Sequence, residues 1–395
     1  MEQIINKIKE LSHSYLEEIK DIRAHLHQYP ELSFEEFKTS AFIQEKLDEY
    51  GISYKSGFVK TGIVGTIEGK NPNKKVLALR ADMDALPVTE NDSHSICSKN
   101  TGVMHACGHD MHMASLLGTA KILQELKNEW EGTVLIIFQP GEELLPGGAR
   151  MMMEEGALTP QPDLIMAQHV LPDMESGHVG FREGMYMASG DEIYLKIKGK
   201  GGHGAMPHRC DDTVLIASHI VVALQQIVSR RADIRIPTVL SFGRMIAEGA
   251  TNIIPQEVNI AGTFRTMDEK WRAEAKRLIT EIAQNTAKGM GAVCEVDIKH
   301  GYPYLVNHIG HTRSAKSAAT AYLTSEKVED MDIRMTTEDF GFYSQKYPAC
   351  FYRFGVKKDK SGGLHTSNFE AEDQSLETSM GTMAYLAMDF LNKSE

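Results

Sequence analysis

Short apolar runs that alternate with helical patterns constrain the fold of this chain more than any other feature. Residues 76–80 and 134–138 are almost continuously apolar, and residues 164–167 repeat the pattern. Such runs are typical of parallel strands that are covered on both faces. A helical pattern over residues 114–126 lies between the first two runs. The resulting order of strand, helix and strand predicts an α/β sheet with right-handed crossovers.

The middle of the chain has a different order of elements. The patterns predict, in sequence, a strand, a helix, two strands, a helix and a last strand, over residues 192–198, 212–230, 238–242, 257–265, 269–288 and 292–299. This βαββαβ order is ferredoxin-like. A chain of 395 residues is also too long for one ordinary core. We therefore predict a discontinuous α/β domain of residues 1–188 and 300–395 and an inserted α+β domain of residues 189–299.

Composition and charge exclude several classes of partner. The chain has 42% hydrophobic and 24% charged residues, and its formal net charge is -12. An acidic protein without a basic patch is not expected to bind nucleic acid or an anionic membrane. The longest apolar run, over residues 215–224, is too short for a membrane span, and the first residues do not resemble a signal peptide. Five scattered cysteines favour reduced thiols in the cytoplasm.

Residues 102–113 concentrate metal-binding side chains. This stretch holds one thiol, three imidazoles and a carboxylate, namely Cys107, His105, His109, His112 and Asp110. Thiolate and imidazole ligands suit Zn, Mn, Co or Ni. The alternative is a small buried cysteine beside a surface histidine, but so many ligand types within eight positions favour a metal. We predict Cys107 and His109 as the ligands, with the other three as supporting groups.

A pair of carboxylates, Glu142 and Glu143, follows the run that ends near residue 138. One could bind a metal while the other takes a proton from a water that the metal activates. A solvated acidic pair at the start of a loop is the alternative. Asp84 similarly follows the run that ends at residue 80. It could support a ligand imidazole, or it could be an ordinary turn aspartate before a proline.

Three further histidines are candidates. His169 is expected just after the strand that ends at residue 167, where α/β sheets bind their ligands. His169 and His365 are lone histidines, and spacing alone leaves a structural role open for both. His203 lies in a glycine-rich loop of the inserted domain and could donate to a developing oxyanion. An incidental histidine in that loop is the alternative.

Taken together, these residues resemble those of a known family, the dinuclear metal amidohydrolases. Its members include plant auxin–amino acid conjugate hydrolases, hippurate hydrolases, N-acyl amino acid deacylases and N-acetyl-diaminopimelate deacetylases. The resemblance rests on LHQYPELS (26–33), RADMDALP (80–87), HACGHD (105–110), FQPGEE (138–143), GHGAMPH (202–208), NIIP (252–255) and TEDF (337–340). One departure is Gly141, where many relatives have alanine.

The resemblance implies a role for each candidate residue. Two divalent ions (Mn, Zn, Co or Ni) would be held by Cys107, His109, Glu143, His169 and His365. It implies Glu142 as the general base and Asp84 as the carboxylate that supports the metal centre. His203 would reach an active site, often across a dimer interface, and Asn252 and Arg265 would lie near the substrate carboxylate. The fold it implies is a catalytic α/β domain with a mixed, mainly parallel sheet and an inserted ferredoxin-like lid or dimerisation domain.

We therefore expect a cytoplasmic, homo-oligomeric hydrolase that cleaves the amide bond of N-acyl amino acids. One alternative is a carboxypeptidase or dipeptidase on the same scaffold, and another is an N-acetyl-diaminopimelate deacetylase. A third keeps catalysis but uses Cys107 as a nucleophile. A fourth is a non-catalytic metal-binding module, although a closed structural site does not need the spare carboxylate of the Glu142–Glu143 pair.

Overall fold

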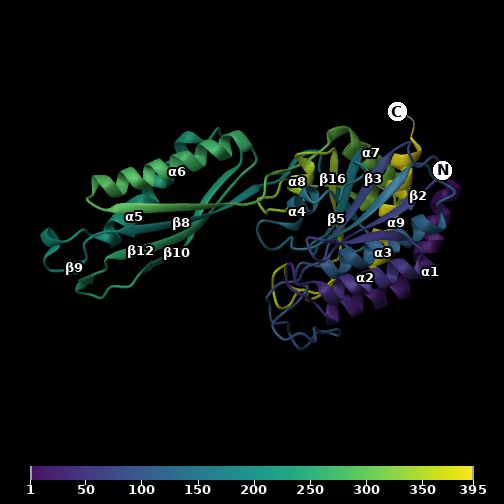
Figure 1. The fold of residues 1–395 in the computed structure, drawn as a ribbon, viewed down its shortest axis with the longest axis horizontal. Coiled ribbons are helices and arrows are strands. Elements are labelled where there is room, and N and C mark those ends of the chain that lie inside the picture. The colour runs from purple at the N-terminus through teal and green to yellow at the C-terminus, as the bar shows by residue number, and fades with distance from the viewer. Residues whose placement is uncertain (1, 394–395) are drawn as a thin grey trace. The chain divides into compact units, whose positions relative to one another are not determined.

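The computed structural model describes residues 2–393, and the chain forms two compact units (Figure 1). The first unit consists of Met1–Tyr186, Val306–Ile333 and Phe342–Glu395, and the second of Met187–Leu305 and Arg334–Gly341. The segment 334–341 therefore packs with the second unit, whereas the predicted boundary at residue 300 assigns it to the α/β domain. Two short strands, β7 (Gly184–Met187) and β14 (Leu305–Asn307), lie where the chain passes between the units.

The first unit is built on an eight-stranded sheet. The strand order is β1-β2-β4-β3-β5-β16-β6-β15. The four central strands, β4, β3, β5 and β16, are parallel to one another, while β1, β2 and β6 add antiparallel pairs. The bounds are β1 (Ser53–Phe58), β2 (Gly62–Glu68), β3 (Val76–Asp82), β4 (Thr133–Gln139), β5 (Leu164–Leu171), β6 (Val179–Phe181), β15 (Val328–Asp330) and β16 (Ala349–Gly355). The predicted mixed, mainly parallel sheet is confirmed.

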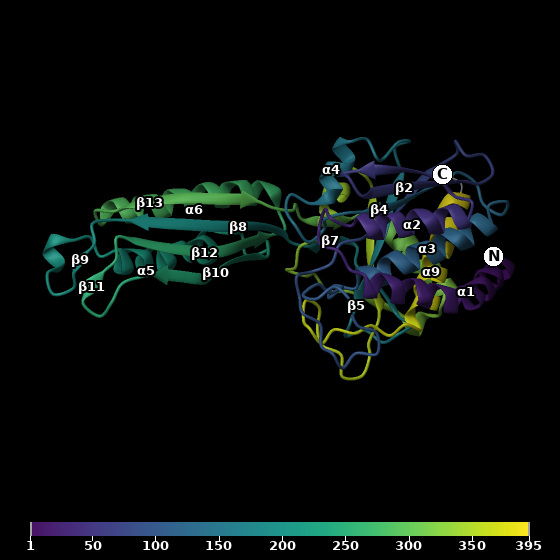
Figure 2. The same ribbon diagram turned by 60° about the horizontal axis from the view of Figure 1, so that its bottom comes forward.

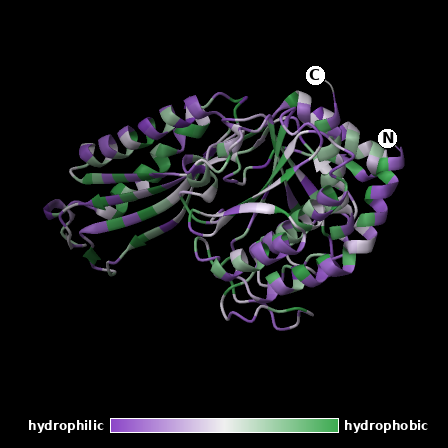
Figure 3. Ribbon diagram, turned by 45° about the vertical axis from the view of Figure 1, so that its right-hand side comes forward, coloured by the Kyte–Doolittle hydropathy of each residue, from purple (hydrophilic) through white to green (hydrophobic). Residues whose placement is uncertain are grey.

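Both faces of the central strands are covered. Every residue of β4, β5 and β16 is buried, and Figure 3 shows hydrophobic residues in the interior of this unit. The helices of this unit are α1 (Glu2–Gln28), α2 (Phe37–Glu49), α3 (His109–Glu125), α4 (Gly148–Glu154), α7 (Ile309–Tyr322) and α9 (Ser375–Asn392), with a short α8 (Gly341–Ser344).

Three of these helices, α1, α3 and α9, pack against one another (Figure 2). Gly118 of α3 lies at their meeting point, where an added Cβ would come within 2.5 Å of Met380 on α9 and 3.2 Å of Ile19 on α1. This close approach fixes α3, whose first turn carries the predicted ligand His109.

The second unit has the predicted ferredoxin-like order. Its sheet runs β10-β12-β8-β13 with antiparallel neighbours throughout. Helices α5 and α6 pack on one face of the sheet, and β9 pairs with β11 in a separate two-stranded ribbon. The bounds are β8 (Ser189–Lys198), β9 (Gly202–His203), α5 (Thr213–Leu224), β10 (Thr238–Ala247), β11 (Ile253–Ile254), β12 (Glu257–Thr266), α6 (Glu269–Gly289) and β13 (Val293–His300).

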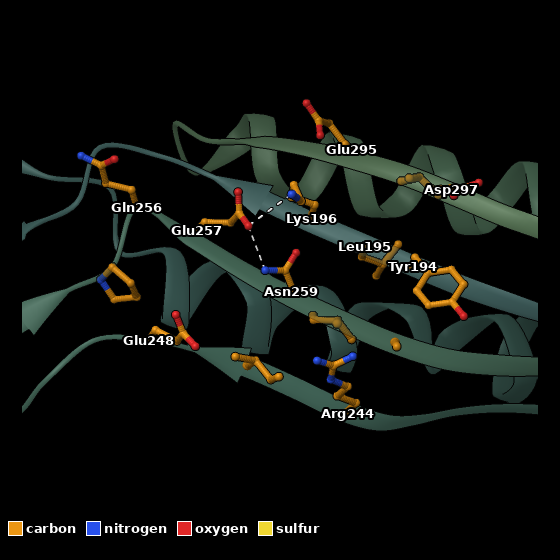
Figure 4. Close-up of a pocket in the computed structure, with 15 residues that line it drawn as sticks. Tyr194, Leu195, Lys196, Arg244, Glu248, Gln256, Glu257, Asn259, Glu295 and Asp297 are labelled. Carbon is orange, nitrogen blue, oxygen red and sulfur yellow. Dashed lines mark hydrogen bonds and ion pairs between the residues drawn. The ribbon is translucent and has the colours of Figure 1, made fainter. Parts of the chain in front are cut away.

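The side chains of β8 alternate between a buried face of the sheet and a face that is open to water. Ile193 and Leu195 point into the core beneath the helices, whereas Tyr194 and Lys196 point to the opposite, open face. Figure 4 shows that open face, where a recess of about 880 Å³ is lined mainly by polar and charged side chains. Lys196 pairs with Glu257 across the strands at 3.3 Å. This alternation is typical of an antiparallel sheet that faces water on one side.

The apolar helical segment that includes α5 is longer than the predicted apolar run of residues 215–224. The helical stretch Thr213–Arg231 has 19 residues, and by length and composition alone it is long and apolar enough to cross a membrane. The prediction that no run is long enough to do so is therefore wrong. One face of the helix is nevertheless packed in the core of the second unit through Ile216, Ile220 and Leu224, which is the arrangement of a helix in a globular α+β domain.

A buried ion pair connects α6 to the start of β8 in the second unit. Arg272 of α6 makes two 2.8 Å contacts to Asp191 at the start of β8, and both side chains are fully buried. The same guanidinium donates to the carbonyl oxygens of Gly190 and Gly301. It therefore ties α6 to both ends of the chain segment that forms this unit.

Replacement of Arg272 by leucine is expected to lower the free energy of unfolding of the second unit by about 3 kcal/mol, because the buried Asp191 carboxylate loses its closest partner and keeps only the longer contacts to Lys276 at 3.4 Å and to the Gly301 N–H at 3.2 Å. The measurement is urea-induced unfolding. Arg277→Leu on the same helix is the matched control, since Arg277 pairs with Glu274 and Glu281 at the surface, and it should change little. An Arg272→Leu variant as stable as the control would refute a structural role for this pair.

Candidate metal centre

The predicted ligands of the first unit gather at the carboxyl ends of its parallel strands. Asp82 is the last residue of β3, and Glu142 and Glu143 follow the end of β4. His169 lies within β5, which extends to Leu171, so the expectation that it follows the strand is wrong. Because β3, β4 and β5 are parallel neighbours, these side chains reach the same edge of the sheet.

The turn before α3 carries two further predicted ligands, Cys107 and His109, and packs against β5. Gly108 has φ +79°, and an added Cβ would come within 2.6 Å of Val170 on β5. Only glycine accommodates both the left-handed backbone and this close approach. The turn therefore places the thiol just before the helix and the His109 imidazole in its first turn.

Cys107 lies at the centre of the cluster. Its Sγ is 3.5 Å from Nε2 of His169 and 3.3 Å from Nε2 of His365. The Nε2 atom of His365 is in turn 3.2 Å from Oε1 of Glu143. Two groups of three ligand atoms share the thiol, Cys107–His109–His169 and Cys107–Glu143–His365, and within each group all atoms lie within 4.8 Å of one another.

His365 reaches this cluster from a loop. Its backbone has φ +62°, a conformation that is uncommon for a residue with a side chain. The His365 N–H donates to the carbonyl oxygen of Ala106 at 2.8 Å, one residue before Cys107. The loop is thereby attached to the turn that carries the thiol.

Asp84 organises the other side of the cluster. Its carboxylate is buried and accepts hydrogen bonds from the backbone N–H groups of Glu142 at 3.1 Å and Glu143 at 2.9 Å. The Nδ1 atom of His109 lies 2.8 Å from the Asp84 carbonyl oxygen and 3.4 Å from its Oδ1. The opposite ring nitrogen, Nε2, is thus directed toward Glu143, whose Oε1 is 3.9 Å away.

The chemistry of these donors fits divalent cations. Within the described residues 2–393, the buried Nε2 of His109 has no hydrogen-bond partner. Burial, together with the carboxylates of Glu143 and Glu142, raises the pKa of the Cys107 thiol well above its usual value. Buried anionic donors around a thiol are costly without a compensating positive charge. Cys107, His109, Glu143, His169 and His365 are together able to hold two such ions.

His112 and Asp82 lie next to the predicted ligand His109. His112 Nδ1 lies 2.6 Å from Oδ1 of Asp82, and the N–H of Val170 donates to His112 Nε2 at 2.9 Å. These bonds fix the ring as a neutral imidazole with its proton on Nδ1. Asp82 Oδ2 is also 3.7 Å from Nε2 of His109. Sequence reasoning does not single out Asp82, although the largely apolar run that precedes it in β3 is a signal of burial.

The other members of the 102–113 stretch lie elsewhere. The Asp110 carboxylate binds Arg23 and His27 of α1, each at 2.8 Å, and so anchors the start of α3. His105 is buried, and neither of its ring nitrogens finds a hydrogen-bond partner among the described residues. Neither residue belongs to the groups of potential metal ligands found in the described part of the chain.

The remaining candidates belong to the second unit. His203 lies in β9 opposite Ile253 of β11, and the N–H of Gly204 donates to the carbonyl oxygen of Asn252 at 2.8 Å. His203 and Asn252 are therefore neighbours. Arg265 is not near them, because it pairs with Gly190 at the start of β8, whereas His203 follows the end of that strand.

Comparison with known proteins identifies the family of this chain. Residues 78–389 match the family described as Peptidase family M20/M25/M40. The chain is 42% identical to an N-acyl-L-amino acid amidohydrolase of Geobacillus stearothermophilus, over 72% of this chain and 77% of that protein. It is 36% identical to thermostable carboxypeptidase 1 of Saccharolobus solfataricus, over 100% of this chain and 99% of the other.

A solved structure of an M20 family protein is also similar to this chain. The YXEP protein of Bacillus subtilis, a dinuclear metal-binding peptidase of the M20 family, is 32% identical and has a TM-score of 0.82, with coverage of 96% of this chain and 99% of that one. The expected resemblance to the dinuclear metal amidohydrolases is confirmed. The chain belongs to the M20/M25/M40 peptidase family and is a metal-dependent hydrolase.

Proposed function

We propose that this protein hydrolyses the amide bond of N-acyl amino acids. The observation that carries the proposal is the buried carboxylate of Glu142, which adjoins the cluster of potential ligands formed with His109 and Glu143. A carboxylate in excess of the metal ligands is what hydrolysis needs and a structural metal site does not. The relative with 42% identity, an N-acyl-L-amino acid amidohydrolase, supports this class of substrate.

Two divalent ions would be held by Cys107, His109, Glu143, His169 and His365, with the thiol common to both groups. Such ions supply Lewis acidity, which polarises the substrate carbonyl and lowers the pKa of water. Glu142 takes the proton from the attacking water and then passes it to the leaving amine. Asp84 keeps Glu142 and Glu143 in place through their backbone N–H groups.

The second unit would contribute to substrate binding. In this proposal the Arg265 guanidinium binds the substrate carboxylate. Since His203 and Asn252 lie at the opposite end of the second unit from Arg265, they would serve the active site of the other copy in a dimer, where His203 donates a hydrogen bond to the developing oxyanion and Asn252 lies near the substrate carboxylate. His203 is exposed, and its Nδ1 accepts the N–H of Ala205 at 3.1 Å, which leaves Nε2 as the donor.

Glu142→Gln is expected to reduce kcat by about 10²–10⁴-fold, the usual contribution of a general base, while the protein retains its metal. The measurements are hydrolysis of N-acetyl and N-benzoyl amino acids and metal content after dialysis. Glu143→Gln is the contrasting variant, since it removes a predicted ligand and should lower metal content as well as activity. A Glu142→Gln enzyme with full activity would disprove the role of Glu142 as the base.

Removal of metal by a chelator is expected to abolish hydrolysis, and addition of Mn, Zn, Co or Ni should restore it, because the proposed mechanism depends on the two ions. The measurement is activity before chelation, after it and after each metal is added, with Ca as the control ion, since Ca prefers oxygen ligands. Full activity of the metal-free protein would instead support Cys107 as a nucleophile.

A carboxypeptidase is the second candidate function, because a relative of that name is 36% identical over nearly the whole length of both chains. A dipeptidase or an N-acetyl-diaminopimelate deacetylase on this scaffold would differ from the first candidate only in what the pocket accepts. A panel of N-acyl amino acids, N-acetyl-diaminopimelate, dipeptides and longer peptides distinguishes these activities by their kcat/KM values.

We further propose that the protein forms a homodimer through its second unit. The outer face of α5 is apolar and exposed, with Leu215 50% and Val222 71% accessible. Exposed apolar patches of this kind mark association surfaces. A helix that already packs one face in its own core can pack the other against a second copy.

The double variant Leu215→Lys/Val222→Lys is expected to be a monomer, because two buried charges would oppose association, whereas the unmodified chain should sediment as a dimer. Sedimentation velocity is the measurement. Gln284→Lys, an exposed position on α6, is the control and should remain a dimer. A wild-type protein that is monomeric and fully active would rule out the dimer as a functional requirement.

A further inference from the structure

Three successive backbone N–H groups of the loop after β4 donate to two buried carboxylates. The N–H groups of Glu142 and Glu143 bind Asp84, and the N–H of Gly141 binds Oε1 of Glu36 at 2.9 Å. Glu36 lies immediately before α2, 105 residues before Gly141 in the sequence, and outside every motif that carries the family resemblance. The loop that carries the predicted base is thus fixed from two sides.

Glu36 is itself held in one position. Its side chain is fully buried, Oε1 also accepts the N–H of Phe34 at 2.9 Å, and Oε2 accepts the Thr61 hydroxyl at 2.8 Å. Burial and the nearby carboxylate of Asp84 raise the pKa of Glu36 to about 7. Two carboxylates in one buried region are costly, so the contacts that they make must offset that cost.

The backbone on both sides of this contact has an unusual conformation. Phe34 has φ +65° and Gly141 has φ +62°. An added Cβ on Gly141 would come within 2.3 Å of the Phe34 ring, so the two segments are in direct contact. One residue earlier, the Ser33 hydroxyl donates to Oδ2 of Asp84 at 2.6 Å. The segment 33–36 therefore supports both carboxylates that bind the loop.

We propose that Glu36 is a positioning residue of the hydrolytic reaction, which fixes Gly141 and thereby the orientation of Glu142 and Glu143. Its role is to place an acceptor oxygen at the Gly141 N–H, and the charge of the carboxylate is secondary. This inference rests on the proposed function, because it assigns the Glu142 side chain to proton transfer. It adds a residue that touches neither substrate nor metal.

Two substitutions distinguish the effect of the position of the Glu36 acceptor oxygen from the effect of the carboxylate charge. Glu36→Gln keeps the length of the side chain and an oxygen that can accept from Phe34 and Gly141, and the Thr61 hydroxyl can rotate to accept from the new amide. Glu36→Asp keeps the charge but withdraws the acceptor by one methylene. We expect Glu36→Asp to lower kcat by about 100-fold with KM unchanged, since small displacements of reacting groups have effects of this size. Glu36→Gln should retain most of the activity.

Hydrogen exchange of the peptide that spans residues 138–148 gives a readout that is independent of activity. Glu36→Asp should accelerate exchange of the amides of residues 141–143, and Glu36→Gln should leave it slow. Glu35→Asp and Glu35→Gln are the matched controls, because Glu35 is the exposed neighbour, and both should behave as the wild type. If Glu36→Asp does not fold, Thr61→Val tests the same anchor, with faster exchange and a lower kcat expected.

Two results would overturn the inference. One is wild-type kcat and exchange in Glu36→Asp or, in its place, Thr61→Val; the other is Glu36→Gln as impaired as Glu36→Asp, which would assign the effect to charge. A wild-type protein that hydrolyses no N-acyl amino acid would instead contradict the proposed function. In that case the exchange rates still decide whether Glu36 fixes the loop.

Discussion

The carboxylate of Asp84 is the interaction on which the rest of the site depends. It is buried, it accepts the N–H groups of Glu142 and Glu143, and it lies against Nδ1 of His109. Three segments that are distant in sequence, the ends of β3 and β4 and the first turn of α3, thus meet at one side chain. Since a buried carboxylate requires such partners, Asp84 and the surrounding groups determine one another's positions.

The same arrangement concentrates negative charge. Asp82, Asp84, Glu142 and Glu143 approach one another in a region that also contains the Cys107 thiol. Histidines offset part of this charge, and the carboxylates of Asp82 and Asp84 outweigh the effect of burial and raise the pKa of His109 to about 10. Divalent ions would replace the protons on these groups and compensate the remaining charge. Metal binding and the stability of this edge of the sheet are therefore coupled.

The sequence predicts those features that depend on local pattern. Apolar runs identify β3, β4 and β5, and the order of elements identifies the ferredoxin-like sheet, because both depend on period and spacing. The position of His169 inside β5 was missed, since the strand continues through two polar residues that a neighbouring strand and helix bury. Glu36 was missed for a different reason. Its partner Gly141 is far away in sequence, and a carboxylate before a helix has the pattern of an ordinary surface residue.

The proposed roles of the residues would divide catalysis and substrate selectivity between the two units. The predicted ligands and base belong to a unit whose central strands are fully buried, where a change in one donor disturbs several others. The residues proposed to bind substrate, His203, Asn252 and Arg265, belong to a unit with its own hydrophobic core. Substitutions there can alter what is bound without disturbing the carboxylate network. Such a separation would explain how relatives named for amidohydrolase and carboxypeptidase activities are 42% and 36% identical to one chain over the matched residues.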